Sequence, residues 1–401
     1  MSFDFDPLQQ QLQSINRSSF SDDVARAQIL VAAQALCHRL ETPLEWVQRM
    51  TWQEPNLNLC LKIADDLQLF KTLGQRDSPA KTGAELAASS EAEPALLERI
   101  LRHLASKQVI NEIPGNEVKY SATELSKALS TPEGGSGIRQ TATLHTTMLS
   151  HVPGYLESTG YRVPTDPRNA PFQQCVGKPG HTYFEWMQEP RNKEAADNMN
   201  LLMKFMTQNR KSWMDVFKPD NLLKQDEDPK APVLVDIGGG FGTDVLDFHR
   251  RFPDFSGRII LQELPAVIAS GREKNPDLIS KGIECQEHDF FTPEPVQGAL
   301  LYFLGSILHD WPDQEARKIL RNIVPAMRKG YSKLLLSENI IPATGCHPHH
   351  SAIDLSMMVL FGAQERTEAH WKDLLESEGL TLVAVHTVPS CLKSVIVAEK
   401  K

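Results

Sequence analysis

Apolar residues along this chain follow two different periods, one before about residue 220 and another after residue 232. In the first part they recur at intervals of three and four, as on one face of a helix. The segment 23–40 shows this spacing at Ile29, Leu30, Ala33, Leu36 and Leu40. Ser21 and Asp22 precede the segment and can cap its first turn, so the pattern predicts a helix over 23–40.

The segment 82–129 has the punctuation of a winged helix. Two stretches with helical spacing are separated by a turn and followed by two short strand-like stretches around Pro114, Gly115 and Asn116. A winged helix can bind DNA through its second helix. Here that helix carries Glu98 beside its basic residues, which favours a structural or dimerisation role.

A break at 130–137 leads into a helical middle region, 139–217, that is rich in large, pliable apolar side chains. These residues are Met148, Phe184, Trp186, Met187, Met199, Met203, Phe205, Met206 and Trp213. Such a stripe is typical of a helical core, but methionine also adapts to irregular ligands and can line an apolar pocket. The pattern alone leaves both interpretations open.

After the charged linker 224–232, short apolar runs alternate with helical stretches, which is typical of βα units and a parallel sheet. The predicted strands are 233–235, 258–262, 283–287, 299–308, 333–337, 381–388 and 393–399. The last two are joined through Pro389 and Ser390 and indicate a hairpin at one edge. We therefore expect an α/β fold in this part of the chain.

Composition narrows the class of protein. A chain of 401 residues corresponds to about two or three domains. With 42 basic and 51 acidic residues the net charge is −9, and the absence of a basic run disfavours nucleic-acid binding. The six cysteines form no CxxC pair, the first residues lack a secretory pattern, and no apolar stretch is long enough to span a membrane. We expect a soluble, cytoplasmic protein.

Five consecutive predicted strands are followed by acidic or imidazole side chains. These are Asp236, Glu263, Asp289, the pair His309 and Asp310, and Glu338. The carboxyl ends of parallel strands meet at one edge of a sheet, where ligands bind. Any one of these residues could be a polar cap on the surface, but five together indicate a site.

The first turn of the sheet reads Asp-x-Gly-x-Gly-x-Gly, with Asp236, Gly238, Gly240 and Gly242. Glycines let the backbone turn sharply and approach a ligand closely. The spacing differs from the dinucleotide fingerprint, whose third glycine lies one position later and admits a pyrophosphate. The preceding carboxylate suits a cationic ligand better than a phosphate.

Two further positions extend this binding site. Glu263, 27 residues after Asp236, is placed to accept hydrogen bonds from ribose hydroxyls. Asp289 can accept from an adenine amino group, and Phe290 offers an aromatic face to the ring. The pattern predicts a pocket for a positively charged nucleoside without phosphates.

The motifs together resemble a known family. They are Asp236 to Gly242, QELP at 262–265, HDFF at 288–291, HDWPD at 309–313, SENIIP at 337–342 and ERT at 365–367. The chain is similar over essentially its whole length to class I S-adenosylmethionine-dependent O-methyltransferases of the plant caffeic-acid type, which include fungal enzymes that methylate polyketide phenols. The resemblance implies a Rossmann-like, seven-stranded sheet and a helical, winged-helix-like dimerisation domain. It also implies a homodimer.

From the resemblance and the breaks in pattern we expect three regions: a dimerisation domain at 1–135, a helical substrate-pocket region at 136–223 and a cofactor-binding catalytic domain at 224–401. The cofactor implied is S-adenosylmethionine, which leaves as S-adenosylhomocysteine. Its expected contacts are Asp236, Gly238, Gly240, Glu263, Asp289 and Phe290. The expected acceptor contacts are Phe184, Met187, Met203, Met357, Met358 and Phe361.

In the family, the histidine that corresponds to His309 is the general base, and glutamates at the positions of Glu338 and Glu365 hold its imidazole. The chemistry agrees, because a phenol of pKa about 10 stays protonated at neutral pH and an imidazole of pKa about 6.5 can take its proton. Two positions depart from the family. Gly305 stands where relatives carry Lys or Arg near the cofactor, and Glu263 stands where Asp is more frequent.

Three alternatives accompany this interpretation. The run CHPHH at 346–350 could bind a metal, but it lacks partners at ligand spacing and is better explained as an exposed loop, so no metal is predicted. Some relatives retain S-adenosylmethionine and catalyse pericyclic reactions without methyl transfer. A cofactor-binding regulator that uses a winged helix on DNA is the third alternative, disfavoured by the acidic charge.

Overall fold

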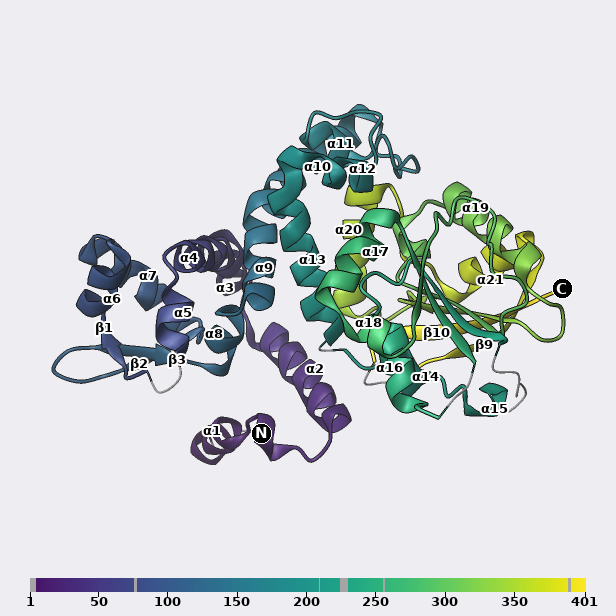
Figure 1. Ribbon diagram of the computed structural model, residues 1–401. Helices are drawn as coiled ribbons and strands as arrows, with labels where there is room; N and C mark the ends of the chain where they lie inside the picture. Colours follow the sequence, from purple (N-terminus) through teal and green to yellow (C-terminus); the bar gives the residue numbers. More distant parts are fainter. Residues whose placement is uncertain (1–4, 76–77, 209, 224–229, 255–256, 389–390) are drawn as a thin grey trace.

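The computed structural model describes residues 5–75, 78–208, 210–223, 230–254, 257–388 and 391–401. A small helical unit near the N-terminus is joined by long middle helices to a larger unit built on a sheet (Figure 1). Most of the predicted linker, 224–229, and the predicted turn at Pro389 and Ser390 lie outside the described residues.

The N-terminal unit packs helices against a three-stranded antiparallel sheet of order β1-β3-β2. Its elements are α1 (Phe5–Ser14), α2 (Asp23–Leu40), α3 (Pro43–Gln48), α4 (Glu54–Asp66), α5 (Leu69–Gly74), β1 (Lys81–Thr82), α6 (Gly83–Ser90), α7 (Pro94–Ser106), β2 (Ile110–Ile113), β3 (Lys119–Ala122) and α8 (Glu124–Leu129). Glu98 on α7 accepts a hydrogen bond from the hydroxyl of Tyr120 at 2.8 Å, so this carboxylate holds the strand against the helix.

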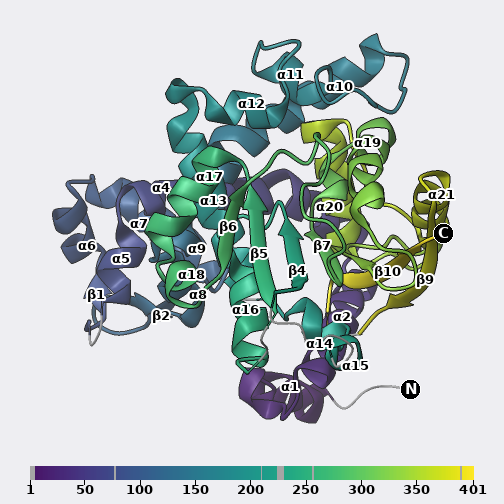
Figure 2. The ribbon, with the colours of Figure 1, turned by 45° about the vertical axis from the view of Figure 1, so that its right-hand side comes forward.

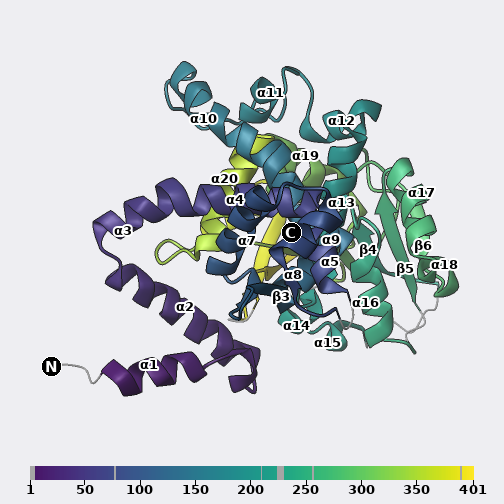
Figure 3. The same ribbon diagram turned by 90° about the vertical axis from the view of Figure 1, so that its left-hand side faces the viewer.

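The helix predicted over 23–40 is confirmed as α2, and the Asp22 side chain caps it by accepting from the Ala25 N–H. Its apolar residues are nevertheless not buried: Leu36 is partly covered by this chain, whereas Ile29, Leu30 and Leu40 are exposed. Figure 3 shows α1 and α2 as an arm at the edge of the molecule. The helical period therefore reflects a face that a single chain leaves open.

The middle region consists of helices, as predicted, and two of them are long. They are α9 (Pro132–Gln140), α10 (Thr146–Ser158), α11 (Pro171–Cys175), α12 (Tyr183–Gln188), α13 (Lys193–Gln208), α14 (Trp213–Val216) and α15 (Asp220–Leu223). A π-helical turn at Thr141–His145 joins α9 to α10. The predicted domain boundary at residue 135 falls within α9.

The larger unit contains a seven-stranded sheet of order β6-β5-β4-β7-β8-β10-β9, in agreement with the expected fold class (Figure 2). The strands are β4 (Pro232–Ile237), β5 (Arg258–Glu263), β6 (Glu284–Glu287), β7 (Leu301–Gly305), β8 (Lys333–Glu338), β9 (Leu380–His386) and β10 (Ser394–Lys400). The first five are parallel, whereas β10 runs antiparallel to both β8 and β9. The predicted edge hairpin thus supplies β9 and β10.

One predicted strand is too long. The run 299–308 forms β7 only as far as Gly305, and the chain then turns through Ser306, whose φ is +58°, into a 3₁₀ turn at Leu308–Asp310. The apolar residues of the turn are still buried, so hydrophobicity alone could not reveal the break. Helix α19 (Asp313–Ile323) follows this turn and gives way to a second 3₁₀ turn, which contains Pro325.

Both faces of the sheet are covered by helices. Alternate strand residues such as Tyr302 and Leu336 belong to one apolar cluster, which also contains Trp371, and their neighbours Phe303 and Leu335 belong to another. The first cluster includes α19 and α21 (Glu368–Ser377); the second includes α14, α16 (Thr243–Arg251), α17 (Pro265–Lys274) and α18 (Asp277–Ser280). This two-sided burial is why the parallel strands read as continuous apolar runs.

A third apolar cluster joins the middle region to the sheet unit. Helix α20 (Pro348–Phe361) contributes Met357 and Phe361, which pack with Phe172, Tyr183 and Trp186 of α11 and α12. The middle helices are therefore fixed over the carboxyl ends of the strands. Within the residues that the structure describes, no helix is long and apolar enough to cross a membrane.

The sheet core sets a first expectation for stability. Leu336 is fully buried in the centre of β8, so replacing it with alanine should leave a cavity and lower the free energy of unfolding by about 2–5 kcal/mol. Urea denaturation followed by circular dichroism measures the change. The matched control is Ile279→Ala, which is 65% exposed on α18 and should change stability by less than about 0.5 kcal/mol. Equal effects of both substitutions would contradict the assignment of the core.

Candidate active site

A large cleft of about 2170 Å³ lies at the carboxyl ends of the strands, beneath the middle helices. Most of the residues predicted for the site line it: Asp236, Gly238, Gly240, Glu263, Asp289, Phe290, His309, Phe184, Met187, Met203, Met357 and Phe361. Glu338 and Glu365 are buried directly behind its wall, and Met358 does not line it.

The glycine turn after β4 has the sharp backbone conformation that the spacing of its glycines predicts. Gly238, Gly240 and Gly242 have φ angles of +70°, +58° and +77°, which side chains rarely adopt. A Cβ on Gly238 would lie 2.7 Å from Ile307 Cδ1, so this position also needs glycine for space. Around Gly240 the space is open, and its backbone faces the cleft.

Asp236 ends β4 beneath this turn and is 1% exposed. Its Oδ2 has no hydrogen-bond partner among the described residues. Burial, reinforced by the negative charges of Asp244 and Glu263, raises the pKa of Asp236 well above its ordinary range. A buried carboxylate in this state is stabilised by a nearby cation, so the position suits the positively charged end of a ligand.

Glu263 ends β5 and is fixed by backbone groups. Its Oε1 accepts from the Gly240 N–H at 3.2 Å and its Oε2 from the Leu264 N–H at 2.7 Å. Burial raises the pKa of Glu263, although these two donors oppose the rise. The carboxylate keeps acceptor positions for ligand hydroxyls, since each oxygen can take more than one hydrogen bond.

Asp289 and Phe290 follow β6 at the far end of the cleft. The Phe291 N–H donates to Asp289 Oδ1 at 2.9 Å, which orients the carboxylate, and the side chain is exposed to the cleft. Phe290 packs edge-on against Trp311. The open glycine backbone, the unpartnered Asp236 oxygen, and a carboxylate and an aromatic ring at the other end fit a cationic nucleoside such as S-adenosylmethionine.

His309 lies on the 3₁₀ turn after β7 with carboxylates on both sides of its ring. Nδ1 is 2.9 Å from Glu365 Oε1, and Nε2 is 3.4 Å from Asp310 Oδ1. Burial lowers the pKa of His309, but the negative charges of Asp310, Glu338 and Glu365 outweigh burial and raise it to about 9. The pKa of Asp310 is raised to about 7 by burial, despite the opposing charge of His309.

The two glutamates expected to hold the imidazole are placed differently. Glu365 contacts the ring, and its Oε1 also accepts from the side chain of Asn339 at 2.8 Å. Glu338 Oε1 instead accepts from the backbone N–H groups of Ile307 and Leu308, at 3.1 and 3.0 Å. Among the described residues, no hydrogen bond or ion pair joins Glu338 to the imidazole. It therefore fixes the turn that carries His309 and acts on the ring by its charge.

Arg366 also holds the turn that carries His309. Its position in the ERT motif did not indicate this role. Although fully buried, it donates to the carbonyls of Leu308 and Trp311, both at 2.8 Å, and pairs with Asp313. Arg366 thereby holds the backbone carbonyls on both sides of His309, and Glu338 holds the backbone amides that precede it. The ring position is set by buried charge-assisted bonds rather than by the strand itself.

The wall of the cleft opposite the glycine turn is aromatic. Phe184 stacks on Phe361, with ring centroids 5.3 Å apart, and on Trp311 at 5.6 Å. Met357 and Phe361 are four residues apart on α20 and share its cleft face. Met358 was predicted to join them, but it is rotated by about 100° along the helix and packs in the apolar cluster behind. Its predicted acceptor contact therefore has no support from the cleft lining.

The methionine-rich middle region divides between the two roles that its pattern left open. Met148 and Trp186 are buried in the apolar core that joins the domains. Other members line the cleft: Phe184, Met187, Met199, Met203, Phe205, Met206 and Trp213.

Further charged or titratable residues that the sequence analysis did not select line the cleft, among them Arg210, His349 and Lys393. His349 belongs to the run CHPHH, which was expected to be an exposed loop. In the structure Pro348 begins α20, and this helix brings His349 to the cleft. The described residues include no group of three or more His, Cys, Asp or Glu side chains arranged to hold a metal.

Comparisons with known proteins agree with this geometry. A family profile described as an O-methyltransferase domain matches residues 165–381, and one described as an O-methyltransferase dimerisation domain matches residues 56–132. O-methyltransferase mfmE of Annulohypoxylon moriforme is 37% identical over 97% of this chain and 94% of its own. Demethylsterigmatocystin 6-O-methyltransferase of Aspergillus flavus is 32% identical over 95% of both chains.

A solved structure described as a pericyclic reaction enzyme is similar in fold. It aligns over 99% of both chains with a TM-score of 0.88 and 29% identity.

The carboxylates around His309 predict a measurable titration. In ligand-free protein the imidazole should titrate near pH 9 rather than 6.5, and Glu365→Gln should lower that pKa because it removes the bonded charge. Because folding raises this pKa, the His309 contribution to stability is complete below pH 6.5 and is lost as the pH rises through about 9. NMR titration of labelled histidine measures both pKa values.

The matched control is Glu287→Gln, an exposed residue of β6. A His309 pKa that is the same in wild type and Glu365→Gln would contradict the assigned interaction.

Proposed function

The chain belongs to the O-methyltransferase family, and from this premise we propose that it transfers the methyl group of S-adenosylmethionine to a phenolic hydroxyl of a polyketide-derived aromatic metabolite. The observation that carries the proposal is the setting of His309. Glu365 occupies its Nδ1, so Nε2 is the nitrogen left to accept a proton from a hydroxyl in the cleft. The cofactor residues and the aromatic wall lie on either side of it.

The cofactor is proposed to bind along the glycine turn. Asp236 would meet its cationic amino-acid end, Glu263 its ribose hydroxyls, and Asp289 with Phe290 its adenine. When bound, S-adenosylmethionine supplies an electrophilic methyl group on a positively charged sulfur. The residues of the cleft align the acceptor oxygen with that methyl group and exclude water, and such alignment lowers the barrier of a displacement.

His309 is proposed as the general base. The ring accepts a proton only when it is neutral, so a positive charge bound in the same cleft prepares it by opposing protonation. The hydroxyl proton then moves to Nε2 as the oxygen–carbon bond forms. Glu365 on Nδ1 and the charges of Asp310 and Glu338 stabilise the imidazolium that results.

The acceptor is proposed to be a flat aromatic molecule. Phe184, Trp311 and Phe361 present stacked rings to the cleft, and aromatic pairs of this kind favour an aromatic ligand. Met187, Met203 and Met357 can adapt their side chains to its outline. The similarity to an enzyme named for demethylsterigmatocystin supports this choice of acceptor class.

The alternative is a pericyclic reaction that uses the bound cofactor without consuming it. The structural similarity to a pericyclic reaction enzyme favours this alternative. His309 and Glu365, which a simple pericyclic step does not require, support methyl transfer instead. The two functions differ in a product, since only methyl transfer yields S-adenosylhomocysteine in proportion to the organic product.

We also propose a homodimer built on the N-terminal unit, which we interpret as winged-helix-like. Large apolar side chains are exposed on α2 to α4 and the π-helical turn between them: Leu40 is 71% exposed, Trp52 61% and Trp46 49%. Clustered exposure of this kind marks an interface. Because the cysteine pattern suits a reducing compartment, we propose a cytoplasmic location.

The role of His309 is tested by His309→Ala. Loss of the general base should lower the rate of methyl transfer by about 10²–10⁴-fold, while the dissociation constant for S-adenosylmethionine changes little. A panel of phenolic polyketides with labelled S-adenosylmethionine, analysed by mass, identifies an acceptor. The rate and S-adenosylhomocysteine formation are then measured with it.

The control for this experiment is His103→Ala, a residue of α7 in the N-terminal unit. Full activity of His309→Ala would rule out the proposed role. Turnover of an organic substrate without S-adenosylhomocysteine would favour the pericyclic alternative.

The interface is tested by placing a charge within it. The double variant Trp46→Asp and Trp52→Asp should be monomeric at concentrations where wild type is dimeric, because buried unpaired carboxylates strongly oppose association. Sedimentation velocity measures the mass. Ile279→Asp, which introduces the same charge on an exposed site of α18, should remain dimeric. A dimeric double variant would place the interface elsewhere.

A further inference from the structure

One corner of the cleft contains charged groups that the proposed mechanism does not use. It lies beside the glycine turn, where β7 and β8 end and β10 begins, on the face covered by α14 and α16. Gly305 lies at this corner, where a Cβ would be 3.0 Å from Phe303 and 3.7 Å from Asp244. Arg210 and Lys393 line the cleft, and both interact with Asp244 here: Arg210 through a hydrogen bond and Lys393 through charge.

Arg210 precedes α14, and its guanidinium is held at the start of α16. Its Nη2 donates to Asp244 Oδ2 at 2.6 Å. Asp244 lies in the first turn of α16, two residues after Gly242. A guanidinium has five N–H donors in a rigid fork, so one bonded oxygen leaves donors that a second carboxylate can use.

Lys393 approaches from the other side. It precedes β10, whose first residue, Ser394, pairs with Glu338 at the end of β8. Burial, and after it the positive charge of Arg210, lower the pKa of Lys393 to about 8 despite the nearby carboxylates. Two cations that oppose each other in a half-buried corner are stabilised by an anion between them.

The neighbouring Asp236 indicates which anion. Its unpartnered oxygen suits an ammonium group, and Arg210 is close enough for its charge to lower the pKa of Asp236. In an amino acid the ammonium and carboxylate groups are attached to one carbon atom, so a ligand ammonium at Asp236 places its carboxylate within a few bond lengths. The cationic corner is therefore complementary to the other half of the same zwitterion.

We propose that Arg210, assisted by Lys393, binds the carboxylate of the amino-acid end of S-adenosylmethionine. This inference rests on the proposed function, because it assumes that cofactor in the cleft. It assigns the positive charge to Arg210, before β4, and Lys393, before β10, whereas position 305, where the family resemblance implies a basic residue, is glycine in this chain. A purely structural role for Arg210, in which it only neutralises Asp244, is the competing explanation.

Two ligands separate these explanations. Decarboxylated S-adenosylmethionine keeps the nucleoside, the sulfonium and the amine but lacks the carboxylate. Isothermal titration calorimetry with wild type should show tighter binding of S-adenosylmethionine than of the decarboxylated compound. Arg210→Gln should weaken S-adenosylmethionine binding roughly 10- to 100-fold and leave the decarboxylated compound almost unaffected, so that the preference collapses. Lys393→Gln should reduce the preference by about 3- to 10-fold.

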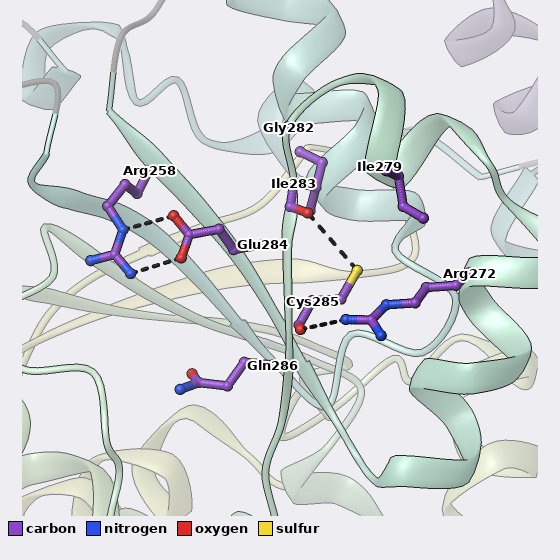
Figure 4. A pocket seen from close by; sticks show the side chains of 8 residues that line it. All are labelled: Arg258, Arg272, Ile279, Gly282, Ile283, Glu284, Cys285 and Gln286. Carbon is purple, nitrogen blue, oxygen red and sulfur yellow. Dashed lines mark hydrogen bonds and ion pairs between the residues drawn. The ribbon is translucent and has the colours of Figure 1, made fainter.

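Arg272→Gln is the matched control, since Arg272 lies on α17 away from the cleft. It donates to the Cys285 carbonyl at 3.1 Å and lines a separate surface depression beside β6 (Figure 4). This variant should keep the wild-type preference. Thermal unfolding verifies that each variant is folded. Arg210→Lys keeps a charge at the site and should retain an intermediate preference, which provides the test if Arg210→Gln does not fold.

Each other outcome contradicts a stated claim. If Arg210→Gln weakens both ligands equally, Arg210 acts only through Asp244 and the inference is wrong. If wild type binds both ligands with the same affinity, no carboxylate site exists. If wild type binds neither ligand, the proposed function itself fails, which is distinguishable from failure of this inference alone.

Discussion

The site depends on a turn that buried charges hold in place. After Gly305 the chain leaves the sheet, and nothing in the strand itself would position His309. Glu338 binds the amides that precede this histidine, and Arg366 binds carbonyls on both sides of it. Both charged residues are almost fully buried, where an unpaired charge is costly. In this conformation of the turn both buried charges have backbone partners, and the position of the His309 ring follows from that constraint.

The same interior contains more carboxylates than cations. Asp236, Asp310 and Glu338 all have raised pKa values, for which burial is the largest cause. A folded chain tolerates such groups when positive charge is supplied nearby. His309 supplies part of it by taking a proton, and a cationic ligand can supply the rest. Binding of a cationic ligand and protonation of His309 are thus coupled, because each of these positive charges changes the free energy of adding the other.

The sequence predicted the sheet and its rim well, for a physical reason. Strands buried on both faces are continuous apolar runs, and a polar residue that ends such a run must lie at the rim, so Asp236, Glu263 and Asp289 could be selected without coordinates. Lys393 and Arg210 could not, because neither ends a parallel strand. Met358 does not line the cleft, because composition does not give the rotation of α20, and His349 was not selected because nothing in CHPHH shows that a helix begins there.

The parts that hold ligands differ in rigidity, and this difference follows from packing. The glycine turn and the His309 turn are joined to a sheet that is covered on both faces, so their geometry is fixed before a ligand arrives. The opposite wall comes from α12, α13 and α20, which share a smaller apolar cluster and present methionines to the cleft. Unbranched thioether side chains adapt at little cost. Such an arrangement keeps the glycine turn and His309 in fixed positions while the opposite wall can change its shape, so under the proposed function the choice of acceptor could diverge without moving the proposed base.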